Sequence, residues 1–134
     1  MIQIVTSNLT AWSAFFRLVA EKSAIRDPVL YLLQEHRLPA SSLESVVGGR
    51  RLKQLRFQAA LNAAILTDKG GVSSGVGVVS SQPLVSTSAL PPACTLPLGE
   101  RCIWRIWAGG GNSAAGILFV SVYLYTGEGM RHRN

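Results

Sequence analysis

The sequence predicts an α/β fold built on a mixed sheet, and three observations lead to this prediction. An amphipathic helical pattern lies between two short apolar strand patterns near the N-terminus, which is the order of a parallel βαβ unit. Later apolar segments are separated by Gly-rich turns, which is typical of antiparallel hairpins. The 134 residues, of which 48% are hydrophobic, suffice for one compact domain over residues 1–134 and exclude intrinsic disorder.

The N-terminal unit begins with a strand predicted at residues 2–6, which ends near Asn8. In the helix after it, apolar side chains recur at three- and four-residue spacing, at Trp12, Phe15, Phe16, Val19 and Ala20. Thr10 is its predicted N-cap. Pro28 ends it, because the residue before a proline is pushed out of the helical region. Five consecutive apolar residues at 29–33 then predict a strand buried on both faces.

Residues 39–58 are predicted to contain a short helix. Ser41 or Ser42 is its expected N-cap, and the pair Gly48-Gly49 interrupts it. The most basic stretch of the chain follows, with cations at Arg50, Arg51, Lys53 and Arg56. Two interpretations stay open for these side chains: a solvated helix or loop face, and a nucleic-acid-binding surface that contacts the phosphate backbone.

Two hairpins are predicted in the rest of the chain. The first joins strands at residues 59–66 and 75–79 through turn residues 68–71 and a Gly- and Ser-rich connection. The second joins strands at residues 102–108 and 116–124 through a Gly-rich turn. Since a crossover unit is followed by antiparallel pairs, the sheet is expected to be mixed.

Charge and hydropathy narrow the classes of function. The 13 Lys+Arg against 7 Asp+Glu give a net charge of +6, which favours a phosphate-bearing partner such as nucleic acid. The longest apolar run, residues 114–125, is shorter than the about 20 residues of a membrane-spanning helix, so no membrane span is expected. The N-terminus has no secretory signal pattern, so we expect an intracellular protein of the cytoplasm or nucleus.

Low surface charge is a second compositional feature. Charged residues make up 15% of the chain, against about 25% in typical domains. This indicates apolar surface that a partner covers, and self-association through such surface is one expected outcome. Cys94 and Cys102 are expected to be free thiols, with a disulfide between them as the alternative, and neither has the spacing of a zinc site.

Polar side chains follow the first two predicted strands, with Asn8 after the first and Glu35 after the second. Because the carboxyl ends of parallel strands meet at one edge of a sheet, these two side chains are expected in the same crevice. A hard cation such as Mg²⁺ takes one or two carboxylates together with water and phosphate oxygens. The pattern therefore predicts a metal site, and the alternative is a turn residue at Asn8 and a solvated strand end at Glu35.

Three ordered segments resemble the endonuclease/exonuclease/phosphatase superfamily. The first is Asn8 after a leading strand, followed by Leu33-Gln34-Glu35-His36-Arg37 after a buried strand. The second, TDKGGVSSGVGV at residues 67–78, is similar to the Gly-Gly hairpin of that superfamily. The third, VSVYLYTGEG at residues 120–129, is similar to its central strand and the loop after it. Together the segments span most of the chain.

The resemblance implies an α/β sandwich that hydrolyses phosphodiesters or phosphomonoesters with Mg²⁺ or Mn²⁺. It makes Glu35 the principal metal ligand and Asn8 a residue that helps to hold the metal shell. It makes Tyr123 a catalytic residue that hydrogen-bonds the scissile phosphate. A strand tyrosine packed in the core is the alternative for Tyr123.

The sequence also departs from the superfamily pattern. The Gly-Asp-x-Asn segment, a further aspartate and a C-terminal Ser-Asp-His are not found after Tyr123. His36 is not expected to replace the missing histidine, because in an extended strand it points to the face opposite Glu35. The chain therefore resembles an incomplete, N-terminal half of the catalytic domain. Aromatic side chains that the other half would bury are expected at Trp104, Trp107, Phe119 and Tyr123.

Two functions follow from the sequence. The first is a divalent-metal-dependent phosphoester hydrolase-like domain, which acts on nucleic acid phosphodiesters in its full-length form. The second is a non-catalytic, truncated remnant or a basic nucleic-acid-binding module.

Overall fold

The structure, a computed structural model, describes residues 2–22, 28–83, 102–107 and 117–123, without the side chains of residues 104 and 107. In chain order its elements are β1 (Gln3–Asn8), α1 (Ser13–Glu21), β2 (Val29–Gln34), α2 (Ala40–Val47), α3 (Arg50–Gln54), β3 (Gln58–Asn62), β4 (Ile65–Leu66), β5 (Val72–Ser73), β6 (Val76–Ser80), β7 (Cys102–Trp107) and β8 (Ile117–Val122). α1 ends at Glu21, several residues before the stop predicted at Asp27-Pro28. The turn of the second hairpin and Cys94 lie outside the described residues.

The main sheet has four strands in the order β1-β2-β6-β3. β1 and β2 are parallel, with Asn8 opposite Gln34, and α1 connects them. β6 is antiparallel to both of its neighbours. The predicted βαβ unit and the mixed sheet are therefore confirmed, and the chain is an α/β protein.

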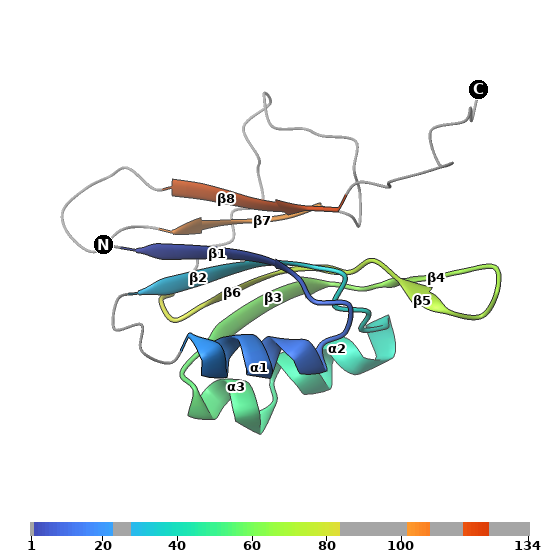
Figure 1. Ribbon diagram of the computed structural model, residues 1–134, viewed down its shortest axis with the longest axis horizontal. Coiled ribbons are helices and arrows are strands. Elements are labelled where there is room, and N and C mark those ends of the chain that lie inside the picture. The colour runs from blue at the N-terminus through green and yellow to red at the C-terminus, as the bar shows by residue number, and fades with distance from the viewer. Residues whose placement is uncertain (1, 23–27, 84–101, 108–116, 124–134) are drawn as a thin grey trace.

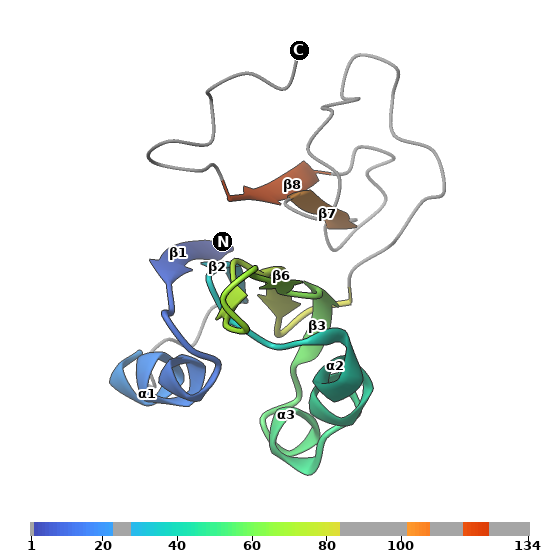
Figure 2. The same cartoon turned by 90° about the vertical axis from the view of Figure 1, so that its right-hand side faces the viewer.

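Two layers cover this sheet on opposite faces (Figures 1 and 2). The helices α1, α2 and α3 lie on one face, and the antiparallel hairpin β7–β8 lies on the other. Successive strand residues point to opposite faces, and β2 follows this rule, since Tyr31 and Leu33 join the helix-side core while Leu30 joins the hairpin-side core. The strand predicted to be buried on both faces is confirmed.

The helix-side core is aromatic. Phe15 is completely buried and lies 5.3 Å from Tyr31 and 6.2 Å from Phe57, measured between ring centroids. Leu52 of α3 joins the same core, which explains why a five-residue helix with so many cations is anchored there. These contacts fix the helices to the sheet by apolar burial.

The predicted helix caps are wrong. Thr10 has φ +58° and its hydroxyl donates to the Leu9 carbonyl over 2.6 Å, so it forms a local turn before α1. The second predicted cap, Ser41 or Ser42, lies inside α2, whose N-cap is Pro39, two or three residues earlier. In both places a local backbone conformation replaces the side-chain cap that the sequence predicts.

The single strand predicted at residues 59–66 is divided into two strands, β3 and β4. β3 and β4 are separate, because the chain between them turns so that the Ala64 amide donates to the Leu38 carbonyl over 2.8 Å. β4 and β5 form the tip of the hairpin around the predicted turn.

The expectation that Phe119 lies on uncovered surface is wrong. Its side chain is only 6% exposed and belongs to the hairpin-side core.

Candidate functional site

Glu35 lies at the carboxyl end of β2, where the backbone leaves the extended conformation. Its φ is +55°, which is left-handed. In a continued strand its side chain would follow Leu33 to the helix face. Instead the Tyr123 hydroxyl donates a hydrogen bond to Glu35 Oε1 over 2.6 Å, on the hairpin side. The left-handed turn thus places the carboxylate beside the residue that follows β8.

Ser121 attaches β8 to the end of β2 and so positions Tyr123. The buried Ser121 hydroxyl donates to the Leu33 carbonyl over 2.9 Å. The same oxygen accepts a hydrogen bond from Gln34 Nε2 over 3.0 Å. Since these contacts join two strands far apart in sequence, they fix the register that brings Tyr123 to Glu35.

Asn8 lies at the end of the neighbouring parallel strand. Its backbone is opposite Gln34, one residue before Glu35, and the Leu9 amide donates to the Gln34 carbonyl over 2.8 Å. The exposed Asn8 side chain accepts a hydrogen bond from the Thr10 amide at Oδ1 over 3.2 Å. Asn8 therefore acts as a turn residue, as one of the two interpretations expects. Its Oδ1 atom has a second lone pair that can accept from or bind another group.

His36 is buried beside the site and does not share a surface with Glu35. Its ring is 1% exposed and packs edge-on against Trp12 of the helix side, with ring centroids 6.4 Å apart. Its Nδ1 accepts from the Leu38 amide over 3.0 Å, and Nε2 is 3.3 Å from the Val76 carbonyl oxygen. This arrangement requires the neutral Nε2–H tautomer. Burial lowers the pKa of His36, although its backbone hydrogen bonds oppose the shift.

Left-handed residues cluster around His36. Glu35 and Arg37 flank it with φ of +55° and +56°, and Ser74 and Gly75 on the opposite segment have φ of +62° and +92°. The His36 amide donates to the Gly75 carbonyl and the Arg37 amide to the Ser74 carbonyl. A non-glycine residue in this region costs of the order of 1–3 kcal/mol, and such strain concentrates at functional sites. This end of the sheet is therefore the candidate functional site.

Two side chains at this end carry oxygen atoms of the kind that hard cations bind. Glu35 provides a half-buried carboxylate and Asn8 an amide oxygen, from adjacent ends of two parallel strands. Mg²⁺ keeps several waters and needs only one or two carboxylates plus substrate phosphate. Among the described residues, no group of three or more His, Cys, Asp or Glu side chains is placed to hold a metal ion. A cation held by Glu35 and Asn8 would therefore take most of its ligands from water or from a substrate.

The basic stretch lies on the other side of the sheet. Its four cations are exposed on or just after α3, at Arg50, Arg51, Lys53 and Arg56. The Arg51 guanidinium lies 3.7 Å from the centre of the Phe16 ring of α1. α3 covers the helix face, whereas Tyr123 packs against the hairpin-side core. The structure brings Asn8, Glu35 and Tyr123 to one end of the molecule and leaves the cations on a separate surface.

Sequence reasoning missed two residues that build this site. Ser121 is a lone hydroxyl inside an apolar strand, and that isolation is the signal for a buried polar contact. Gly75 is the other residue, since a Cβ there would lie 2.6 Å from His36 Cε1. The pattern of residues 68–71 indicates a turn, and it carries no signal for the close approach of Gly75 to His36.

Comparison with known proteins found no matching family model, no matching curated protein and no matching solved structure. The resemblance to the endonuclease/exonuclease/phosphatase superfamily therefore rests on the three sequence segments alone.

In the described part of the chain, no helix is long and apolar enough to cross a membrane. The Cys102 thiol is free, and burial raises its pKa.

Proposed function

We propose that the chain is a divalent-metal-dependent phosphoester hydrolase-like domain of the endonuclease/exonuclease/phosphatase type. The observation that carries the proposal is the 2.6 Å hydrogen bond from Tyr123 to Glu35, beside the end of the parallel strand that carries Asn8. A half-buried carboxylate that accepts a tyrosine hydroxyl is held in one orientation. An oriented carboxylate at the end of a strand whose parallel neighbour ends in an amide side chain is suited to a cation that binds phosphate.

The roles of the three residues follow from their contacts. Glu35 and Asn8 would hold Mg²⁺ or Mn²⁺, which when bound neutralises charge on the phosphoryl oxygens. The Tyr123 proton is already donated to Glu35, so this residue orients the carboxylate. That role differs from the direct phosphate contact that the resemblance implies for Tyr123.

Nucleic acid is the proposed substrate. A net charge of +6 raises the local concentration of polyanions around the chain. Phosphodiesters of DNA or RNA supply both the phosphate oxygens that complete a Mg²⁺ shell and the negative charge that the protein attracts.

Metal binding is the first test, because it reports on Glu35 and Asn8 without requiring catalytic turnover. Titration of the chain with Mn²⁺, followed by the electron paramagnetic resonance of the free ion, is expected to show one site. Glu35→Gln should weaken Mn²⁺ binding by about tenfold or more, since outer-shell changes alone cost about 10–100-fold. Tyr123→Phe should weaken it less than Glu35→Gln does.

Glu44→Gln is the matched control, because Glu44 is exposed on α2, on the helix face. This variant should bind Mn²⁺ as the unaltered chain does. Hydrolysis of bis(p-nitrophenyl) phosphate and of plasmid DNA is measured with the same variants. Equal Mn²⁺ binding by the unaltered chain and by Glu35→Gln would refute the metal site.

One observation favours the second candidate, a non-catalytic basic nucleic-acid-binding module. Arg50, Arg51, Lys53 and Arg56 are all exposed on the surface away from Glu35. Binding of labelled duplex DNA that falls steeply with salt, is weakened by Lys53→Glu and is unchanged in Glu35→Gln would support this candidate. Binding that is lost in Glu35→Gln and kept in Lys53→Glu would contradict it.

A further inference from the structure

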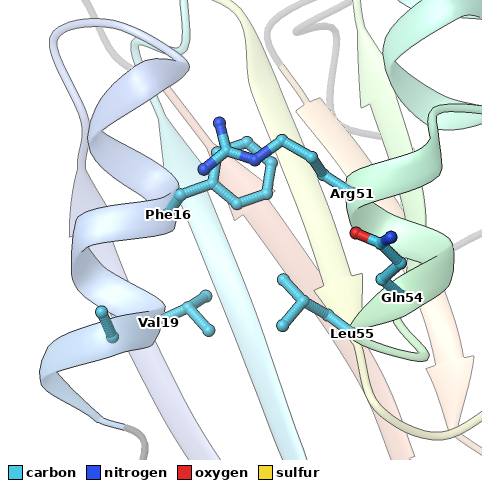
Figure 3. Close-up of a pocket in the computed structure, with 6 residues that line it drawn as sticks. Phe16, Val19, Arg51, Gln54 and Leu55 are labelled. Atoms are coloured by element: carbon cyan, nitrogen blue, oxygen red, sulfur yellow. The ribbon is translucent and has the colours of Figure 1, made fainter.

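A shallow groove runs between α1 and the α2–α3 segment on the helix face. It consists of two hollows of about 310 and 290 Å³ that share Phe16 and Arg51. The first is lined by Phe16, Val19, Ala20, Arg51, Gln54 and Leu55 (Figure 3). The second adds Trp12, Val46 and Arg50. The stacked Phe16 and Arg51 side chains therefore lie where the two hollows meet.

The groove is apolar inside. Val19 of α1 and Leu55 after α3 point toward each other across it in Figure 3, and Leu55 is 41% exposed. The Arg51 guanidinium covers the Phe16 ring and leaves the aliphatic groups beside it uncovered. Exposed aliphatic side chains on both walls are the feature of a surface that binds apolar anchors.

The rim of the groove is basic. Arg50 and Arg51 of α3 line the groove, and the exposed Lys53 and Arg56 belong to the same short segment. Arg17 and Glu21 of α1 line a separate hollow with Asn8. Cations therefore lie along the α3 side of an apolar interior, and a ligand with acidic residues on that side is complementary to it.

We propose that this groove binds an amphipathic helix of a partner protein, with acidic residues along the side of its apolar stripe that faces α3. A second copy of this chain does not fit, because it too has a net charge of +6. A nucleic acid satisfies the rim cations and leaves Val19 and Leu55 in water, whereas leucine side chains fill the space between them. The proposal is independent of the chemistry at Glu35.

Fluorescence anisotropy with three labelled probes tests the proposal. The first is a peptide of about 18 residues, roughly 27 Å long as a helix, with Leu repeated at three- and four-residue spacing and Glu elsewhere. The second has the same composition in scrambled order, and the third is a short DNA duplex. The stripe peptide is expected to bind about tenfold or more tightly than the scrambled one, a difference of about one buried leucine.

Two variants with matched controls identify the groove as the site. Leu55→Glu and Arg50→Glu should each weaken binding of the stripe peptide by about tenfold or more. Leu66→Glu and Lys69→Glu make the same changes at exposed positions in and after β4, away from the groove, and should leave binding unchanged. Circular-dichroism melts establish that each variant is folded.

Three results would overturn the proposal. Equal affinity for the stripe and scrambled peptides removes the role of the apolar stripe. Unchanged peptide binding in Leu55→Glu, or no binding of any probe, removes the groove as a protein-binding site. Tighter binding of DNA than of the stripe peptide, weakened by Arg50→Glu and unaffected by Leu55→Glu, assigns the surface to nucleic acid instead.

Discussion

The two faces of the central sheet are packed in different ways. The helix face is closed by interlocking aromatic rings, with Phe15 at 0% exposure among Trp12, Tyr31 and Phe57. The hairpin face has a smaller core in which Phe119 is the one aromatic member among the described buried residues, and it is joined to the sheet by directed polar contacts, such as the Ser121 hydroxyl on the Leu33 carbonyl. Apolar burial is non-directional, whereas hydrogen bonds have a preferred geometry and so fix one register. The helix face therefore supplies stability, and the hairpin face supplies positioning.

Truncation of Phe15 tests the first half of this comparison and should have the largest effect. Phe15→Ala removes a fully buried ring and is expected to lower the free energy of unfolding by about 3–5 kcal/mol. Urea unfolding followed by circular dichroism measures it. Ile4→Ala, at a side chain that is 51% exposed, should stay within about 0.5 kcal/mol. A loss below about 1 kcal/mol in Phe15→Ala would contradict the assignment.

Gly75 tests the junction between the two faces. In Gly75→Ala the new Cβ meets the His36 ring at 2.6 Å in a backbone with φ +92°, so a loss of about 2–4 kcal/mol is expected. Gly70→Ala is the matched control, because Gly70 has φ +75° and an added Cβ there meets nothing within 4 Å. Its loss should be about 1 kcal/mol, from backbone strain alone. Equal losses in the two variants would show that the contact with His36 is unimportant.

Ser121 tests the positioning role of the hairpin face. Ser121→Ala removes the donor to Leu33 and the acceptor of Gln34, and the expected loss is about 1–3 kcal/mol. Hydrogen exchange of β7 and β8 amides should accelerate more than that of β1 and β2. Ser45→Ala, which removes an exposed hydroxyl on α2, serves as the control. Uniform acceleration over both regions would show that the hairpin is not held separately.

The smallest expected effect is the dependence of folding stability on pH that His36 causes, and it develops gradually as the pH falls. The pKa of His36 is lowered in the folded chain by burial, and an unfolded histidine titrates near pH 6.5. The unfolded chain therefore takes up the proton first, so stability is full above about pH 6.5 and falls as the pH drops below it.

Urea midpoints between pH 8 and pH 5.5 measure this dependence. His36→Gln should flatten it, because the buried group that must remain neutral is gone. An equally steep decline in His36→Gln would assign the pH dependence to another group.

The sequence predicted the elements whose signals are local. The apolar run at residues 29–33 and the stripe of α1 identify β2, α1 and their parallel crossover. Asn8 and Glu35 were placed at neighbouring strand ends by the same topology. The left-handed turn at Thr10, which replaces the predicted N-cap, could not be predicted, because it depends on how β1 enters the turn.

The contacts of the candidate site were harder to predict. Tyr123 reaches Glu35 across 88 residues, and its position depends on how the second hairpin lies on the sheet. No local pattern encodes that packing, since Ser121 and Leu33 meet only after both strands are formed. The separation of the basic stretch from Glu35 has the same origin, because it follows from Leu52 anchoring α3 to the helix side.

The attachment of β8 also has a consequence during synthesis on the ribosome. The four-stranded sheet and its three helices are complete once Ser80 has emerged, but the hairpin that covers the other face ends at Val122. At roughly 5–20 residues per second, that face waits several seconds for its cover. During this interval Leu30, Val76 and Val78 form an open apolar surface. The nascent chain is then most exposed to chaperones and to aggregation, before the residues that position Tyr123 exist.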